Sequence, residues 1–558
     1  MSPKNLSKVI HQDLLMVSLV VALFLFSKLL ALPYDLFTGD EGINLQAFWK
    51  ASRGELVYRD FSWHYGPLTP FIFGTLFNLC GVSVQGVRLV YIFVAAVGVA
   101  LAFWIARSLL PPFWSGVASL MAFSMLKLPP HSYNHIFGTL SALWVVAFFF
   151  SYLKCPKGRL RPFFIGIGAA IGLLTKPLPM GFGIFISVIL FVLIHPKKNH
   201  FLRDYLLGVL CLTVPVAVYF SLHVPFNDLV RNIYPMGSGS GAWHYRAYPY
   251  FLDQRFWTSW AQAPGFVLKV KEGVWHFVWT SLWWIPVVCA VIGFLFFRKQ
   301  GQVFFLSLFS VLIYLQPLIT GSDGIGFLLQ VPFILLAYFF YRLWQIKGNS
   351  SLRFLAFSLK VGIAFFIGYF LLFSNYVKGP MQRAHGKVPL SVQVAHGIRV
   401  TPAMKEIYEG TVAYVTQQTM PGEKIFVGSP EPIYYFLCQR DSFLKDEFMT
   451  IRAGIFDLGR IQISRLSSDE KDRIEEELIQ QIKQNKPKCI ILTPVTYFPY
   501  TSHRRKLFDY IEGNYVLGKE IGDPKAFGPG FKILRPGGYF PHYGVKIYKP
   551  KENGEPRG

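Results

Sequence analysis

The sequence predicts a polytopic α-helical membrane protein with a soluble, extracytoplasmic α/β domain at its C-terminal end. Of the 558 residues, 53% are hydrophobic and only 15% are charged, whereas soluble domains contain roughly 25% charged residues. Only eleven of the 31 acidic residues precede residue 378. The chain therefore divides into an apolar membrane domain, residues 1–377, and a water-soluble domain, residues 378–558. Disordered, coiled-coil and ordinary soluble proteins are excluded.

Eight apolar runs are long enough to cross a hydrocarbon core of ~30 Å at ~1.5 Å per residue. A ninth, residues 113–128, is shorter. The stretch 161–197 is broken at Lys176-Pro177, which predicts a hairpin of two short helices and brings the total to about eleven transmembrane helices. The eight long runs are residues 14–32, 87–110, 136–153, 202–222, 277–297, 303–319, 325–343 and 354–373.

One further apolar run, residues 67–81, is too short to cross and contains Pro70 and Gly74. If this run does not cross the membrane, the basic clusters at residues 154–161 and 197–203 lie on the same side of the membrane as Lys4 and Lys8. Basic loops prefer the cytoplasmic side. We therefore expect a juxtamembrane or re-entrant helix, a cytoplasmic N-terminus and an uncleaved first helix, in a protein of the bacterial inner membrane.

This topology leaves three parts of the chain on the periplasmic or extracellular side. They are a first loop at residues 33–86, a second loop at residues 223–273, and the C-terminal domain. In that domain, short apolar runs predict strands at 424–427, 489–492, 516–521 and 545–548, and they alternate with amphipathic helices predicted at 401–418 and 468–484.

The formal charge of +24 reflects basic residues at the ends of apolar runs. Such a distribution indicates membrane topology and lipid contact, and it excludes a nucleic-acid partner. The six cysteines have no metal-finger spacing and are typical of small hydrophobic residues.

The first loop contains five of the eleven acidic residues of the membrane domain. Carboxylates beside hydrocarbon are costly unless they are paired or hydrated, so the adjacent Asp40 and Glu41 mark a candidate site. The alternative is that Asp40 caps the helix predicted from Gly42 to Lys50. Asp60 is ranked second, because an aspartate at such a position is more often a turn residue.

Short motifs recur beside these elements: Asp40-Glu41, Tyr58-Arg59-Asp60-Phe61, Gly66-Pro67-Leu68, Gly81 with Arg88, Leu174-Thr175-Lys176 and Gly321-Ser322-Asp323. Their order, together with a soluble domain on the acid-bearing side, resembles the GT-C superfamily of membrane glycosyltransferases. This superfamily includes bacterial aminoarabinose transferases and protein O-mannosyltransferases.

The resemblance implies an inverting transfer of a sugar, a hexose or pentose, from a polyprenyl-phosphate donor to a hydroxyl of a lipid, glycan or protein acceptor. It assigns Asp40 as the general base, with Glu41 as its neighbour and substitute. The chemistry agrees, because a glycosyl phosphate already has a good leaving group. Such an enzyme needs one base for the acceptor and positive charge for the phosphate.

The candidate cations for the phosphate are Lys176, Arg59, Arg231 and Arg246. A lysine at a helix break is equally consistent with a side chain that reaches to the interface. Arg231 and Arg246 flank the glycine-serine run 237–241, which is either a lid or a plain loop. Asp323, in a short external turn, either caps the next helix or binds a sugar hydroxyl.

Metal dependence is the main chemical ambiguity. His131 and His135 are four residues apart and are able to share a helix face, which would allow a divalent site with Asp40 or Glu41. Residues 130–135 contain no acid, and hard cations prefer carboxylate oxygen. We favour transfer without a cofactor, with His131 or Asn134 as hydrogen-bonding residues for the sugar or acceptor. The alternative is histidines packed at the interface.

A transporter or flippase of lipid-linked sugars is the main competing function. Such proteins place ionisable residues at mid-membrane on broken helices, together with internal repeats. Here the acids lie in an external loop, and the sequence shows no sustained repeat.

Overall fold

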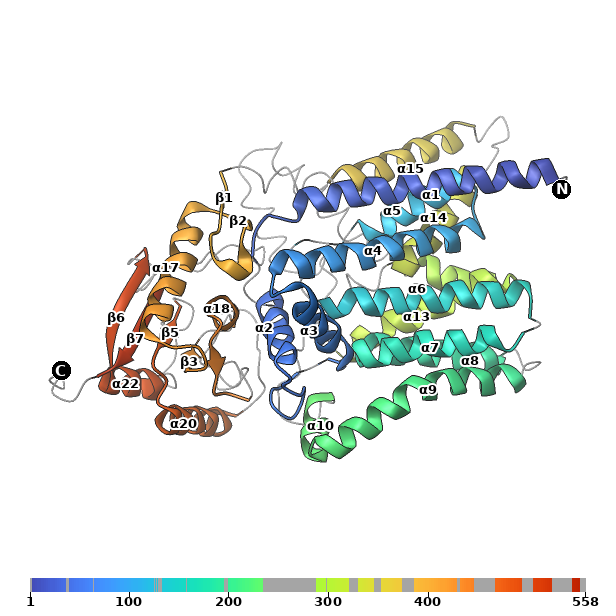
Figure 1. Ribbon diagram of the computed structural model, residues 1–558. Coiled ribbons are helices and arrows are strands. Elements are labelled where there is room, and N and C mark those ends of the chain that lie inside the picture. Colours follow the sequence, from blue (N-terminus) through green and yellow to red (C-terminus); the bar gives the residue numbers. More distant parts are fainter. Residues whose placement is uncertain are drawn as a thin grey trace.

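The computed structural model shows a bundle of long helices joined to a smaller domain built around a mixed sheet (Figure 1). The residues that the structure describes are 3–36, 40–63, 65–124, 126, 128, 133–156, 158–194, 199–233, 288–297, 299–320, 330–345, 353–373, 386–428, 432–445, 467–493, 505–523 and 544–551.

The bundle places the N-terminus at the end opposite the sheet domain (Figure 1). Four helices in the described part combine the length and the apolar composition of membrane spans: Val9–Ala31, Val84–Arg107, Tyr133–Lys154 and His200–His223. These four helices support an integral membrane protein. The bundle contains α1 (Pro3–Ala31), α4 (Val84–Arg107), α5 (Pro112–Phe123), α6 (Tyr133–Lys154), α7 (Leu160–Thr175), α8 (Phe182–Ile194), α9 (Asn199–His223), α13 (Gly301–Thr320), α14 (Gln330–Trp344) and α15 (Arg353–Phe373).

Most of the predicted spans correspond to one of these helices, and the interrupted stretch 161–197 forms two short ones. The break lies at Lys176, followed by a π-helical turn at Pro177–Gly181. Two predicted spans include residues 277–287 and 325–329, which lie outside the described residues.

Helices α7 and α9 touch along small residues. A Cβ atom at Gly166 of α7 would lie 2.1 Å from the carbonyl oxygen of Tyr205, and one at Gly208 of α9 would lie 2.1 Å from that of Phe163. Without a hydrophobic driving force between helices in lipid, such close backbone contact is a main source of helix association.

Two short helices lie between the bundle and the sheet domain (Figure 1): α2 (Asp40–Ser52) and α3 (Leu68–Cys80). The thirteen residues of α3 rise only about 20 Å, too little to cross a bilayer. Phe77 of α3 stacks on Phe436 of the sheet domain at a ring distance of 6.1 Å. The run 67–81 therefore has the position expected of a juxtamembrane helix.

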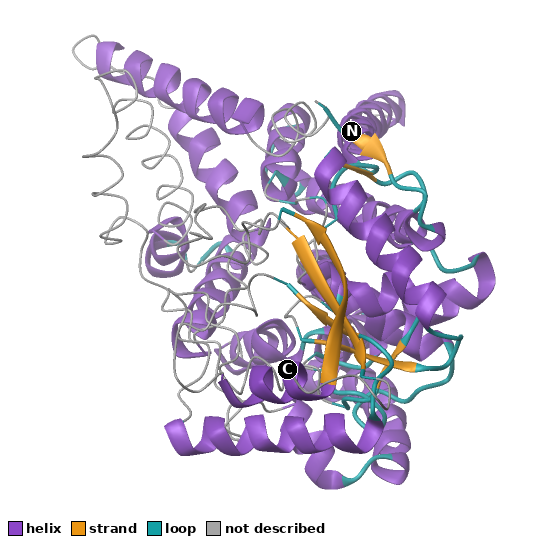
Figure 2. Cartoon of the chain, turned by 90° about the vertical axis from the view of Figure 1, so that its left-hand side faces the viewer, coloured by secondary structure: helices purple, strands orange, loops and turns teal. Residues whose placement is uncertain are grey.

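The sheet domain is the expected α/β domain (Figure 2). Its five-stranded sheet has the order β4-β3-β5-β7-β6, in which β3 pairs in parallel with β4 and β5, whereas β7 runs antiparallel to both neighbours. The strands are β3 (Lys424–Val427), β4 (Asp441–Ser442), β5 (Ile490–Leu492), β6 (Tyr515–Gly522) and β7 (Gly544–Pro550), with helices α17 (Pro402–Gln418), α18 (Ile433–Cys438), α20 (Ser468–Asn485) and α22 (Arg505–Asn514).

The sheet domain contacts the first loop at several points, including α18. A Cβ at Gly42 of α2 would lie only 3.0 Å from the backbone nitrogen of Ile433, so α18 packs directly on α2. Arg53 donates to Asp441 at 3.0 Å, and the Ser62 amide donates to the Lys445 carbonyl at 2.8 Å. The two domains therefore share the first loop as their interface.

The close contact of α7 and α9 makes a testable prediction. Gly166→Val forces a side chain into the backbone of Tyr205, and overpacking of this kind costs about 1–3 kcal/mol or more. We expect a lower midpoint of thermal unfolding in detergent. Gly362→Val on α15 is the matched control, because no atom of the described residues lies within 4 Å of its Cβ position. Equal midpoints for the two variants would contradict this packing.

Candidate functional site

Helix α2 begins at Asp40, directly after residues 37–39, which lie outside the described part. Its N-terminus therefore holds both residues of the predicted acid pair. The side chain of Asp40 is outside the described part as well. Its neighbour Glu41 is fully buried.

Glu41 forms a two-pronged ion pair with Arg88 of α4. Nε and Nη2 of Arg88 donate to the two carboxylate oxygens at 2.8 Å each, and both side chains have no exposed area. The hydroxyl of Tyr133 on α6 donates to Oε1 at 2.9 Å. Glu41 thereby joins α2, α4 and α6.

The remaining donors of Arg88 hold the segment between α1 and α2. Nη1 donates to the carbonyls of Leu32 and Tyr34 at 2.8 and 3.3 Å, and Nη2 donates to the Asp35 carbonyl at 2.7 Å. A buried guanidinium is tolerated only when its donors are satisfied in this way. The path of the chain into the acid pair is therefore fixed by one side chain.

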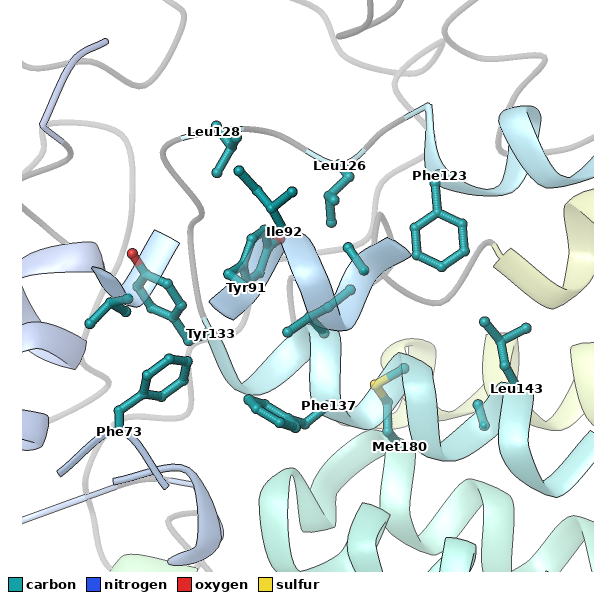
Figure 3. Packing of buried hydrophobic residues seen from close by; sticks show 14 of the residues in the cluster. Phe73, Tyr91, Ile92, Phe123, Leu126, Leu128, Tyr133, Phe137, Leu143 and Met180 are labelled. Carbon is teal, nitrogen blue, oxygen red and sulfur yellow. The ribbon is translucent and has the colours of Figure 1, made fainter. Parts of the chain in front are cut away.

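Three successive residues at the start of α6 connect the N-terminus of α2 to Lys176. Tyr133 contacts Glu41, the Asn134 amide donates to Asn44 Oδ1 at 3.3 Å, and His135 contacts Lys176. Figure 3 shows Tyr133 beside Phe73, with the two rings 5.4 Å apart. The acid-bearing helix and the lysine-bearing turn thus belong to one buried cluster.

Lys176 ends α7 and is buried. Its Nζ contacts Nε2 of His135 and lies 5.1 Å above the ring centre of Tyr65. The Gly66 amide donates to the Thr175 carbonyl at 3.0 Å, and a Cβ at Gly66 would lie 2.1 Å from the Leu174 carbonyl oxygen. Only glycine allows the first loop to approach the Lys176 turn so closely.

Arg59 and Asp60 lie on an outer turn of the first loop, away from the protein interior. Nε and Nη2 of Arg59 donate to the Asp60 carboxylate at 2.9 and 2.8 Å, and the Leu56 amide donates to it at 2.7 Å. The Arg59 hydrogen bond lowers the pKa of Asp60. Burial raises the pKa of the nearby Glu55.

The other predicted site residues are only partly covered by the structure. Arg231 belongs to α10 (Phe226–Ile233), but its side chain lies outside the described part, as do His131, Arg246 and Asp323 entirely. Among the described residues, no group of three or more His, Cys, Asp or Glu side chains is placed to hold a metal ion.

The roles of Arg88, Tyr133 and Tyr65 were not predicted from the sequence. The available signal was an arginine inside an apolar run, since such a charge requires a buried partner. The partner itself lies 47 residues away along the chain.

Structure comparison identifies the architecture. The chain superimposes on ArnT from Cupriavidus metallidurans bound to undecaprenyl phosphate with a TM-score of 0.56, 13% identity, and coverage of 96% of this chain and 97% of that one. The chain therefore has the same fold as ArnT. The predicted resemblance to the GT-C superfamily is confirmed at the level of fold.

The chain is also similar in fold to the archaeal oligosaccharyltransferase AglB from Archaeoglobus fulgidus. In complex with an inhibitory peptide and a dolichol-phosphate it gives a TM-score of 0.52, 11% identity, and coverage of 89% of this chain and 72% of that one. The Archaeoglobus fulgidus oligosaccharyltransferase in complex with Zn and sulfate gives a TM-score of 0.51 and 10% identity, with coverage of 90% of this chain and 72% of that one. No family model and no curated protein matches the sequence.

The buried ion pair makes a second prediction. Glu41→Gln leaves the Arg88 guanidinium without its anion, and breaking a buried pair costs about 3–5 kcal/mol. We expect a large fall in the midpoint of thermal unfolding, partly recovered in the double variant Glu41→Gln with Arg88→Met.

The matched control is Glu55→Gln, whose partner Arg53 is partly exposed, so we expect a change of about 0–1 kcal/mol. A stable Glu41→Gln protein would contradict the structural role of this pair.

Proposed function

We propose that the protein is an inverting glycosyltransferase that moves a sugar from a polyprenyl-phosphate donor to an acceptor hydroxyl at the external face of the membrane. The observation that supports it best is the single buried cluster that joins the N-terminus of α2 to Lys176 through Tyr133, Asn134 and His135. A base and a phosphate-binding cation are the two groups that this reaction needs.

We assign the base to Asp40 and not to Glu41. Both oxygens of Glu41 accept from Arg88, and one accepts from Tyr133 as well. This carboxylate is fully buried and held by these donors, so we propose that it does not reach the acceptor hydroxyl. Asp40 is the first residue of α2, where the positive end of the helix dipole favours an ionised carboxylate.

In the proposed reaction, the acceptor oxygen attacks the anomeric carbon from the face opposite the phosphate. The bond between that carbon and the phosphate oxygen breaks with inversion, the acceptor proton passes to Asp40, and polyprenyl phosphate leaves with the bonding electrons. Lys176 stabilises the phosphate, and Tyr65 and His135 hold its ammonium group in place. Arg59, Arg231 and Arg246 are secondary candidates for the same charge.

The fold relatives support the proposed donor class, because one is bound to undecaprenyl phosphate and the other to a dolichol-phosphate. The proposed acceptor is a hydroxyl on a lipid, glycan or protein. His131, Asn134, Asp60 and Asp323 are proposed to contribute hydrogen bonds to the sugar or acceptor. We place the N-terminus in the cytoplasm and the sheet domain outside.

Replacement of the base gives the most direct test. Asp40→Asn keeps the size of the side chain and removes its basicity, so we expect a folded protein that releases no polyprenyl phosphate from a panel of polyprenyl-phosphate sugars. Loss of a general base costs about 10²–10⁴-fold in rate. Glu55→Gln in the same loop is the control and keeps the wild-type rate. Wild-type turnover by Asp40→Asn would remove the assignment.

Replacement of the cation tests the donor side. A hydrogen bond to a charged group contributes about 1.5–3 kcal/mol, so Lys176→Gln is expected to lower kcat/KM by roughly 10–100-fold. Lys176→Arg retains the charge and is expected to recover part of the loss. The control is Lys405→Gln, on the surface of the sheet domain. An unchanged kcat/KM in Lys176→Gln would exclude the phosphate role.

Metal dependence is tested in the same assay. Because residues 130–135 supply no carboxylate and a hard cation prefers carboxylate ligands, we propose transfer without a metal. Excess EDTA is expected to leave the rate of polyprenyl phosphate release unchanged. A rate that falls with EDTA and returns with Mg²⁺ or Mn²⁺ would contradict this proposal.

A further inference from the structure

One side of α9 consists of exposed apolar residues. Leu207, Leu210, Val214, Val218 and Leu222 are between 47% and 76% exposed, and their spacing of three and four residues places them on one helix face. An apolar stripe of this length on a helix long enough to span a membrane is a lipid-facing surface.

The stripe continues onto α10, beyond a bend at Val224 and Pro225. Phe226 and Val230 are 77% and 42% exposed, and they lie four residues apart on one face of the helix. Helix α10 lies at the end of the bundle that faces the sheet domain (Figure 1). The apolar surface of the bundle therefore extends past the end of the spanning helix.

The opposite face of α10 is occupied by polar contacts to two other parts of the chain. Oδ1 of the buried Asn232 accepts a hydrogen bond from the Trp63 amide at 3.0 Å. The Asp228 carboxylate pairs with Lys445 of the sheet domain at 2.7 Å. Trp63 belongs to the same loop as Tyr65 and Gly66.

We propose that α10 lies in the membrane interface, with Phe226 and Val230 among the lipid acyl chains next to the headgroups. The occupant of this surface is lipid, because the exposed stripe is continuous with the lipid-facing side of α9. A helix with one apolar and one polar face binds in this plane of a bilayer. Helix α10 then holds the first loop and the sheet domain at the level of the bilayer surface.

The test measures the depth of spin labels in lipid nanodiscs. The exposed cysteines Cys80, Cys155 and Cys211 are first replaced by serine. Single cysteines are then introduced by Phe226→Cys and Val230→Cys, with Val214→Cys on α9 as the lipid reference. Asn227→Cys is the aqueous control, because Asn227 is exposed and lies about 100° around the helix from Phe226.

We expect the labels at positions 226 and 230 to collide several-fold more often with oxygen, which partitions into lipid, than with a water-soluble nickel chelate. Position 214 should behave alike, and position 227 should show the reverse ratio. A nickel collision rate at 226 and 230 equal to that at 227 would overturn the proposal.

Shielding of both positions from both reagents would also overturn it, because a protein partner or a second copy of the chain would then cover the surface. The measurement uses no substrate. It therefore remains informative if the proposed transferase activity is wrong.

Discussion

The arrangement of the site depends on one buried ion pair, that of Glu41 with Arg88. The guanidinium donates to the Glu41 carboxylate and to the carbonyls of Leu32, Tyr34 and Asp35. Buried charges are costly alone and stable only as a fully bonded set. The same set holds the segment between α1 and α2. The helix that begins at Asp40 is therefore held in place by the residue that follows it.

The first loop forms hydrogen bonds to several parts of the chain that lie far from it in sequence. Gly66 bonds to the Lys176 turn, Asn232 of α10 accepts from Trp63, and Ser62 donates to Lys445 of the sheet domain. A group that acts on a substrate must be held to within a fraction of an ångström. These contacts supply that rigidity from elements far apart in the chain, which is consistent with the loop carrying the proposed chemistry.

The local sequence pattern predicts most of the helices and strands. It does not predict which side chains pair with one another in the site. The break at Lys176-Pro177 was predictable because proline ends a helix, and β3, β5, β6 and β7 were predictable because each contains a short apolar run. Helix α18 was missed, because its six residues Ile433–Cys438 are all apolar and show no helical period. The pairing of Glu41 with Arg88 was missed because no local rule selects a partner 47 residues away. Function was predictable only as a superfamily, since the pocket for a sugar is assembled from separate loops.

The direct contact of Gly42 with Ile433 has a consequence for biogenesis. The two residues are 391 positions apart in the chain, yet no side chain fits between them. During synthesis the acid-bearing helix emerges early and stays uncovered until α18 has been translated. A shorter nascent chain therefore carries α2 without the helix that packs on it in the folded protein.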